Sequence, residues 1–169
     1  MDLKVHFVLI FTLIAGATSR EVEIENFRPD PKVKSTGFFD FGTLRLKKEN
    51  RNHYSISGDF ELLENSGNEK EILLEVKDKR DKIVMMKSQH KLCDFLKNEK
   101  QIWPDIQRNS NLPEGNPCPM PKGKYWIKDL MIDEKKFSMI PPGEYHGRLA
   151  AIQNNKILAA VDVQCRIIP

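Results

Sequence analysis

Alternation of apolar and polar residues with a period of two is the feature that most constrains the fold of this chain. In its C-terminal stretch every second position is apolar, namely Ile157, Ala159, Val161, Val163, Cys165 and Ile167. Such a pattern predicts a strand with one buried face. Shorter stretches of the same kind contain Val22, Phe39, Tyr54, Ile72, Tyr125 and Tyr145. Roughly seven to nine short strands with frequent turns predict an all-β protein, an immunoglobulin-like two-sheet β-sandwich.

The segment from Cys93 to Tyr125 interrupts this alternation. Just before and within it, Leu92, Phe95 and Leu96 lie at spacings that place them on one face of a short helix. Prolines then recur at positions 104, 113, 117, 119 and 121, and each lacks a backbone donor and fixes its own φ. We therefore expect one short helix and a long proline-rich loop, inserted between strands.

The chain contains three cysteines, which in a secreted protein predicts one disulfide and one remaining thiol. The preferred pair is Cys93 with Cys118, which closes a loop of about 25 residues and is worth about 3.5 kcal/mol in the chain-entropy treatment. Cys165 is then either a small buried side chain in the last strand or a site of pairing between molecules. The sequence leaves this connectivity open.

The first twenty residues indicate export. An apolar run from Phe7 to Ala17 follows Lys4, is too short to cross a bilayer, and ends in small residues suited to signal peptidase. Residues 1–19 are predicted to be a secretory signal peptide, with a buried N-terminal helix or strand as the alternative. Residues 20–169 are then a single domain, and we expect the mature protein to be secreted and extracellular.

Sequence patterns typical of catalysis, metal binding and nucleic-acid binding are not found. The chain has no phosphate-binding glycine loop, zinc-protease motif, Cys-x-x-Cys pair or nucleophile elbow, and His53, His90 and His146 lie in unrelated segments. Its net charge is +3 with both signs interspersed, unlike the concentrated basic face of a nucleic-acid binder. We expect a non-enzymatic protein without metal or cofactor that does not bind nucleic acid.

The predicted inward positions differ greatly in size. Some are small, namely Gly58, Gly147, Ala151 and Ala159, and others are aromatic, namely Phe39, Phe41, Tyr54, Phe60 and Phe95. A sandwich with small residues on one side and aromatic residues on the other can hold a cavity between its sheets. Equally, the small residues can accommodate the rings and leave a filled core, as is usual in protein interiors.

Several short motifs resemble a family of secreted insect proteins of unknown function that includes the chemosensory-protein-B group. The motifs are Asn50-Arg-Asn-His-Tyr-Ser-Ile-Ser-Gly-Asp-Phe-Glu, Cys93-Asp-Phe-Leu-Lys-Asn, Ser110-Asn-Leu-Pro, Cys118-Pro, Gly123-Lys-Tyr-Trp-Ile-Lys-Asp and Pro142-Gly-Glu-Tyr. The resemblance runs from about residue 22 to residue 169. That group is similar in turn to the ganglioside activator protein and the lipid-recognition (ML) superfamily. Those proteins are non-enzymatic β-sandwiches that hold a lipid between two sheets.

The resemblance implies a secreted carrier of a lipid or small hydrophobic semiochemical, with a role in chemosensation such as pheromone or taste response. On this hypothesis the cavity is lined by Phe39, Phe41, Tyr54, Ile56, Phe60, Ile72, Leu74, Ile127, Leu149, Ile157 and Val161, each of which is otherwise an ordinary core residue. Its mouth is formed by Phe95, Trp103 and Leu112. Trp103 either touches a membrane as an exposed tip or covers the end of the sandwich. The partners expected on this hypothesis are a hydrophobic small molecule and, in addition, a membrane surface or a receptor.

A second hypothesis from the same residues is a secreted interaction module. Its core is filled, and its loops act on a receptor or another partner protein. The volume and lining of any space between the sheets discriminate between the two hypotheses, because ligand sites in proteins measure several hundred cubic ångströms.

Overall fold

A computed structural model describes residues 21–30, 33, 37–50, 53–80, 82–100, 102–131 and 140–168 of the chain. The predicted signal peptide, residues 1–19, lies outside these ranges. So does Ile132, which the alternation places at the end of a strand.

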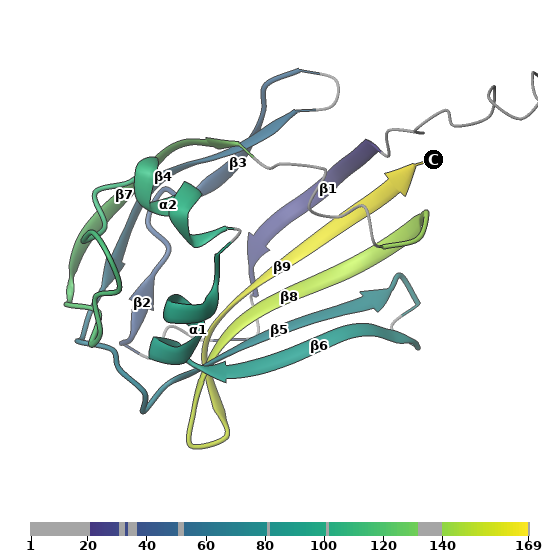
Figure 1. The fold of residues 1–169 in the computed structure, drawn as a ribbon. Helices are drawn as coiled ribbons and strands as arrows, with labels where there is room; N and C mark the ends of the chain where they lie inside the picture. The colour runs from purple at the N-terminus through teal and green to yellow at the C-terminus, as the bar shows by residue number, and fades with distance from the viewer. Residues whose placement is uncertain are drawn as a thin grey trace, which may run out of the picture.

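Five antiparallel strands form the larger sheet, in the spatial order β1-β9-β8-β5-β6 (Figure 1). They are β1 (Glu21–Pro29), β9 (Lys156–Ile168), β8 (Gly143–Gln153), β5 (Glu71–Asp78) and β6 (Val84–Lys91). Strands β8 and β9 form a hairpin whose turn residues, Asn154 and Asn155, both have positive φ. Asparagine tolerates this conformation well, as a two-residue hairpin turn requires.

The smaller sheet is organised around β4 (Tyr54–Leu62). This strand pairs with β7 (Gly123–Met131) and with the two short strands β2 (Phe39–Asp40) and β3 (Arg45–Lys48). The two sheets lie face to face in Figure 1. The prediction of an all-β, two-sheet sandwich is confirmed.

Two glycines allow the chain to pass close to itself at the edge of the smaller sheet. A Cβ atom on Gly58 would lie 2.4 Å from the carbonyl oxygen of Thr43, and one on Gly42 would lie 2.5 Å from that of Asp59. Both residues have positive φ, 137° and 49° respectively. Glycine is therefore needed at both positions for its conformation and for space. A glycine within an alternating strand pattern, as at position 58, predicts a bend or a close approach of another segment, and the structure contains the close approach.

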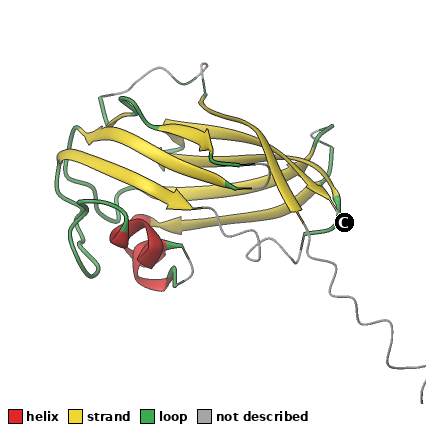
Figure 2. Ribbon diagram, turned by 90° about the horizontal axis from the view of Figure 1, so that it is seen from above, coloured by secondary structure: helices red, strands yellow, loops and turns green. Residues whose placement is uncertain are grey.

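The insert contains two short helices, whereas the sequence predicted one. Helix α1 (Leu92–Asn98) is the predicted one, and helix α2 (Trp103–Arg108) begins where only a loop was expected. That expectation was wrong because Pro104 occupies the first turn of α2, where a missing N–H costs no hydrogen bond. In Figure 2 the two helices lie together at one edge of the sandwich. Helix α1 contacts β5 and β6, and α2 contacts β7.

A disulfide and several hydrogen bonds fasten the insert to the sheets. Cys93 at the start of α1 is bonded to Cys118 in the proline-rich loop, with their Cα atoms 5.6 Å apart, so the predicted pairing is present. The loop is also held by a backbone bridge between Ser66 and Met120 and by the bond from the Lys122 amide to the Asn65 side chain, 2.8 Å long. The proline-rich stretch therefore has a defined path.

Candidate functional site

Two apolar cavities lie between the sheets, each with a volume of about 270 Å³. We call the first the aromatic compartment, because Phe38, Phe39, Phe41, Phe60 and Trp103 line it. We call the second the aliphatic compartment; its lining includes Val22, Ile24, Ile56, Leu74 and Val163. Since protein interiors normally pack at crystal-like density, two such spaces in one small sandwich set this interior apart.

Phenylalanine rings from the smaller sheet form one wall of the aromatic compartment. The rings of Phe39 and Phe60 are stacked with their centroids 5.3 Å apart, and Phe41 meets Phe39 edge-on at 4.6 Å. Phe60 also contacts Tyr125, whose hydroxyl donates a 2.7 Å hydrogen bond to the carbonyl of Pro121. Aromatic pairs in these geometries are attractive, so the wall holds its shape without filling the space.

The opposite wall of the aromatic compartment belongs to the larger sheet and contains small residues. Ala151 of β8 and Ala159 of β9 are partners in the antiparallel register, and both line the space. Alanine side chains leave room that larger residues would occupy. The sequence prediction that small residues face aromatic ones holds here for Ala151 and Ala159, whereas Gly147 lines the aliphatic compartment and Gly58 belongs to the same strand as Phe60.

The insert covers the aromatic compartment at the edge of the sandwich. Leu92 and Leu96 of α1, Trp103 and Ile106 of α2, and Leu112 of the loop all line it. The Trp103 side chain is only 8% exposed, and its indole N–H donates to the carbonyl of Gly115 at 3.4 Å. Of the two roles predicted for Trp103, covering the interior is the one observed, and the exposed membrane-touching tip is wrong.

The aliphatic compartment lies between the other ends of the sheets. Besides aliphatic side chains, its lining includes Tyr145, Asp105, Arg148 and Cys165. The guanidinium of Arg148 is paired with Asp30 and Asp162. Cys165 is a free, half-buried thiol whose pKa is raised by burial and then by the nearby Glu25 carboxylate. Ile102 and Met131 line this compartment and are also exposed, so they form part of its rim.

Leu149 of β8 lines both compartments. Its register partners on the neighbouring strands are Leu74 of β5, which lines the aliphatic compartment, and Val161 of β9, which lines the aromatic one. Although it belongs to a central strand, its side chain is 46% accessible. Leu149 therefore combines a lining position in both compartments with partial exposure.

Nine of the eleven residues predicted to line a cavity line one of the two compartments. In the aromatic compartment these are Phe39, Phe41, Phe60, Ile72, Ile127 and Val161, in the aliphatic one Ile56 and Leu74, and in both Leu149. At the predicted mouth, Trp103 and Leu112 line the aromatic compartment. Phe95 packs half-buried against the core without lining either space.

Two predicted lining residues, Tyr54 and Ile157, lie outside both compartments. Tyr54 is buried at the start of β4, where the Lys48 ammonium lies 5.6 Å from its ring centroid. Ile157 is 37% exposed because the register of β8 and β9 shifts between Ala151 and Ile152. This bulge breaks the strict alternation from which Ile157 was predicted to point inward, and Leu158 packs against the core instead.

Other lining residues were not predicted from the sequence. Val22, Ile24 and Phe27 of β1, with Val76, Tyr145 and Cys165, line the aliphatic compartment, and Phe38, Leu44, Leu62 and Met120 line the aromatic one. Val22, Ile24 and Val76 carried the same alternation as the predicted residues. Alternation could not identify Phe38. It predicts that consecutive residues face opposite sides, whereas Phe38 and Phe39 line the same space.

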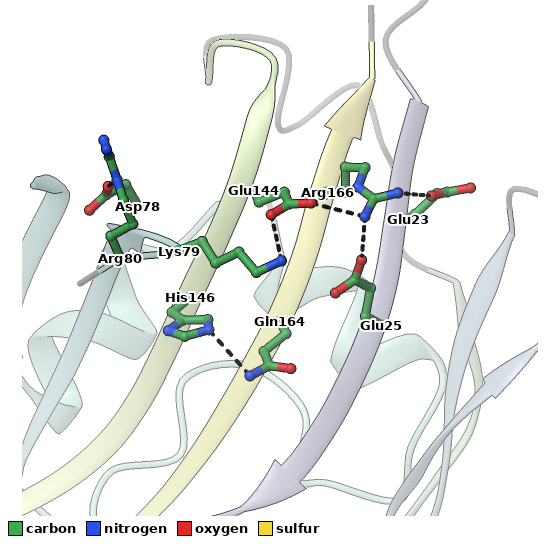
Figure 3. Close-up of polar contacts among 9 residues, drawn as sticks. All are labelled: Glu23, Glu25, Asp78, Lys79, Arg80, Glu144, His146, Gln164 and Arg166. Carbon is green, nitrogen blue, oxygen red and sulfur yellow. Dashed lines mark hydrogen bonds and ion pairs between the residues drawn. The ribbon is translucent and has the colours of Figure 1, made fainter. Parts of the chain in front are cut away.

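The outer face of the larger sheet differs completely from the inner one. Figure 3 shows a row of charged side chains across β1, β9 and β8, in which Arg166 contacts Glu23, Glu25 and Glu144. At the end of the row, the Lys79 ammonium forms an ion pair with Glu144 at 2.6 Å. These ion pairs, with Lys79 first and Arg166 second, lower the pKa of the Glu144 carboxyl. His146 contacts Gln164 on the same face at 3.2 Å.

Neither a metal site nor a membrane-spanning helix is found in the described part of the chain. No three histidine, cysteine or acidic residues converge there in a way that could hold a metal ion. None of the helices within the described ranges is long and apolar enough to span a bilayer.

Comparison with known proteins gives one finding. Residues 71–147 match the model of a family described as a protein of unknown function, DUF1091. This segment runs from β5 through the insert into β8, and so includes both helices and the disulfide. No curated protein matches the chain.

Proposed function

We propose that this protein binds and carries a lipid or another small hydrophobic molecule between its two sheets. The observation that supports the proposal is the pair of unfilled apolar compartments that meet at Leu149. Each measures about 270 Å³, so together they reach the size range of small-molecule sites. The proposal extends to a secreted, extracellular, non-enzymatic carrier with a chemosensory role, as the resemblance to the chemosensory-protein-B group and the lipid-recognition superfamily implies.

The lining favours an aliphatic ligand over a polar one. In the aromatic compartment, Ser66 is the only polar side chain among the described lining residues, and its hydroxyl donates to the carbonyl of Glu64 at 3.2 Å. Burial of each methylene group contributes about 0.8 kcal/mol, before the costs of association. Hydrocarbon length is therefore the main source of affinity, and the charged lining groups, Asp105 and Arg148, belong to the aliphatic compartment.

A binding assay with wall variants tests the proposal. The folded protein is titrated with N-phenyl-1-naphthylamine, whose fluorescence rises in apolar sites, and the dye is then displaced with palmitic acid. Ala151→Leu adds volume inside the aromatic compartment, and Gly147→Leu does so inside the aliphatic one. We expect each variant to weaken, at least about tenfold, the binding of a ligand that occupies the altered compartment, since a filled space no longer accepts it.

Gln153→Leu is the matched control, because Gln153 ends the same strand but lies outside both compartments. It should bind as the wild type does. If the wild-type protein binds neither dye nor palmitic acid while its circular dichroism shows a folded β protein, the carrier function is wrong.

An exposed apolar run supports a second candidate, an interaction module. The run lies at the beginning of β6, an edge strand of the larger sheet, and consists of Ile83, just before the strand, and Val84, Met85 and Met86 within it. Edge strands with exposed apolar side chains can pair with another chain. Light scattering after size exclusion, with and without Val84→Lys, checks this candidate: a partner or second copy that dissociates from the variant supports it.

A further inference from the structure

The geometry points to Leu149 as the residue that sets which chain length the interior accepts, by standing as a partition between the aromatic and aliphatic compartments. This inference rests on the proposed carrier function and deepens it, because it assigns the selectivity to one side chain. It concerns ligands with a single unbranched aliphatic chain.

The partition arises from the order of side-chain sizes along one face of β8. Gly147, Leu149 and Ala151 are separated by two residues each and share a face. Gly147 lines only the aliphatic compartment and Ala151 only the aromatic one, while Leu149 between them lines both. The large side chain of Leu149 therefore projects between two small residues. Because Gly147 and Ala151 are small, they leave unfilled space on each side of it.

The residues of the smaller sheet that line the interior are also divided between the two compartments. On β4, Ile56 lines the aliphatic compartment and Phe60 the aromatic one. The register of β4 with β7 shifts between Ile56 and Gly58, so the boundary passes through the bulge. On β7 the same boundary separates Leu130 from Ile127. A chain that runs the length of the interior therefore has to pass Leu149.

The lining residues in and next to helix α2 are divided between the two compartments in the same way. Asp105 and the adjoining Ile102 line the aliphatic compartment, whereas Trp103 and Ile106 line the aromatic one. The charged lining side chains, Asp105 and Arg148, and the exposed rim residues, Ile102 and Met131, all belong to the aliphatic compartment, which is therefore the side where a polar head group would lie. A chain anchored there fills that compartment first, and further methylenes gain burial only beyond Leu149.

The consequence is a chain-length limit. Within one compartment, each added methylene raises affinity up to about fourfold, which is the equivalent of about 0.8 kcal/mol. Once the compartment is full, added methylenes gain little because the leucine side chain blocks them. Affinity therefore rises with length and then reaches a plateau.

The experiment measures displacement of N-phenyl-1-naphthylamine by straight-chain fatty acids from about eight to about eighteen carbons. Leu149→Ala removes the partition, and we expect the plateau to move to chains at least about two carbons longer, with affinity for the longest acids rising about tenfold. Leu149→Phe enlarges the partition and should move the plateau to shorter chains. Two variants with opposite expected shifts keep the test decisive if one of them folds poorly.

Ile157→Ala is the matched control, since Ile157 is similarly accessible but lies outside both compartments. Its chain-length profile should equal that of the wild type. If the wild type binds the acids but Leu149→Ala and Leu149→Phe both keep its plateau, Leu149 is not the partition and the carrier function stands. If the wild type binds no acid of any length, the carrier function is itself wrong and the inference falls with it.

Discussion

The aromatic and aliphatic compartments have the same volume but are built in different ways. Around the aromatic compartment, stacked rings, a disulfide-bonded insert and buried Trp103 hold the walls. Around the aliphatic compartment, the walls are strand ends, and two lining residues, Ile102 and Met131, are exposed. The comparison teaches that one end of the interior is braced by covalent and aromatic contacts, while the other depends on ordinary aliphatic packing.

Removal of the disulfide should have the largest effect on this contrast. In the double variant Cys93→Ala/Cys118→Ala, we expect the free energy of unfolding to fall by about 3.5 kcal/mol, because the unfolded chain regains the freedom of the closed loop. Urea unfolding measures the loss. Cys165→Ala is the matched control, since its thiol is free, and should cost about 1 kcal/mol or less.

A loss for the double variant no greater than that for Cys165→Ala would show that the insert is held by its hydrogen bonds alone. The bracing of the aromatic compartment by the disulfide would then be wrong.

Truncation of one wall residue in each compartment compares their packing directly. Phe60→Ala removes a buried ring that contacts Phe39 and Tyr125, and should cost about 3 kcal/mol. Leu74→Ala removes a half-buried side chain of the aliphatic compartment and should cost about 1 to 2 kcal/mol. Chemical denaturation of both variants gives the comparison, and equal losses would mean that the two walls are packed alike.

Gly147 offers a change that should stabilise the aliphatic side. A Cβ atom on Gly147 would meet only Val163, at ordinary contact distances of 3.8 Å or more. Gly147→Ala should therefore raise the free energy of unfolding by about 0.5 to 1 kcal/mol, chiefly because the unfolded chain has less freedom to lose. The melting temperature of the variant checks this expectation.

Gly58→Ala is the corresponding control on the smaller sheet. It should destabilise the protein, because the added atom would overlap the Thr43 carbonyl and φ is positive. A loss of stability for Gly147→Ala would indicate that this part of the wall has no spare room.

The smallest effect concerns Glu69, beside the aromatic compartment. Hydrogen bonds from the Gly67 amide, then from the amide of Glu69 itself and from Lys70, hold the pKa of this carboxyl at about 2, against an ordinary value of 4.5. A lowered pKa stabilises the fold above the ordinary value, and the contribution is lost as the pH falls from about 4.5 through about 2. Because the Glu69 side chain is 47% exposed, that contribution should be below about 1 kcal/mol.

Glu69→Gln should accordingly flatten the acid side of the stability curve between those two pH values. Urea unfolding at several pH values measures the slope. An unchanged slope would mean that the three hydrogen-bond donors around the Glu69 carboxylate do not favour its charged form.

Much of the fold could be predicted from the sequence because it rests on local patterns. Alternation predicted the strands, the spacing of Leu92, Phe95 and Leu96 predicted α1, and cysteine usage gave the disulfide. Features that depend on register could not be predicted in this way. Ile157 was placed inward because a bulge opposite Ala151 and Ile152 leaves no mark in the alternation.

The candidate site could be predicted in part for the same reason. Period-two spacing identifies inward residues such as Phe60 and Val161, but it does not say whether the space between them is filled. The existence of two compartments depends on how far apart the two sheets stand and on how small residues such as Ala151 and Ala159 face the rings. Those features depend on tertiary structure. So does the burial of Trp103 beneath the loop whose carbonyl accepts a hydrogen bond from its indole N–H.

The most direct test of the account is native mass spectrometry of the folded protein mixed with palmitic acid in slight excess. The account predicts a complex with one added ligand mass under non-denaturing conditions, and the bare chain once the protein is unfolded. A bare chain under both conditions, from protein whose disulfide is intact and whose fold is verified, would contradict the claim that the space between the sheets is a ligand site.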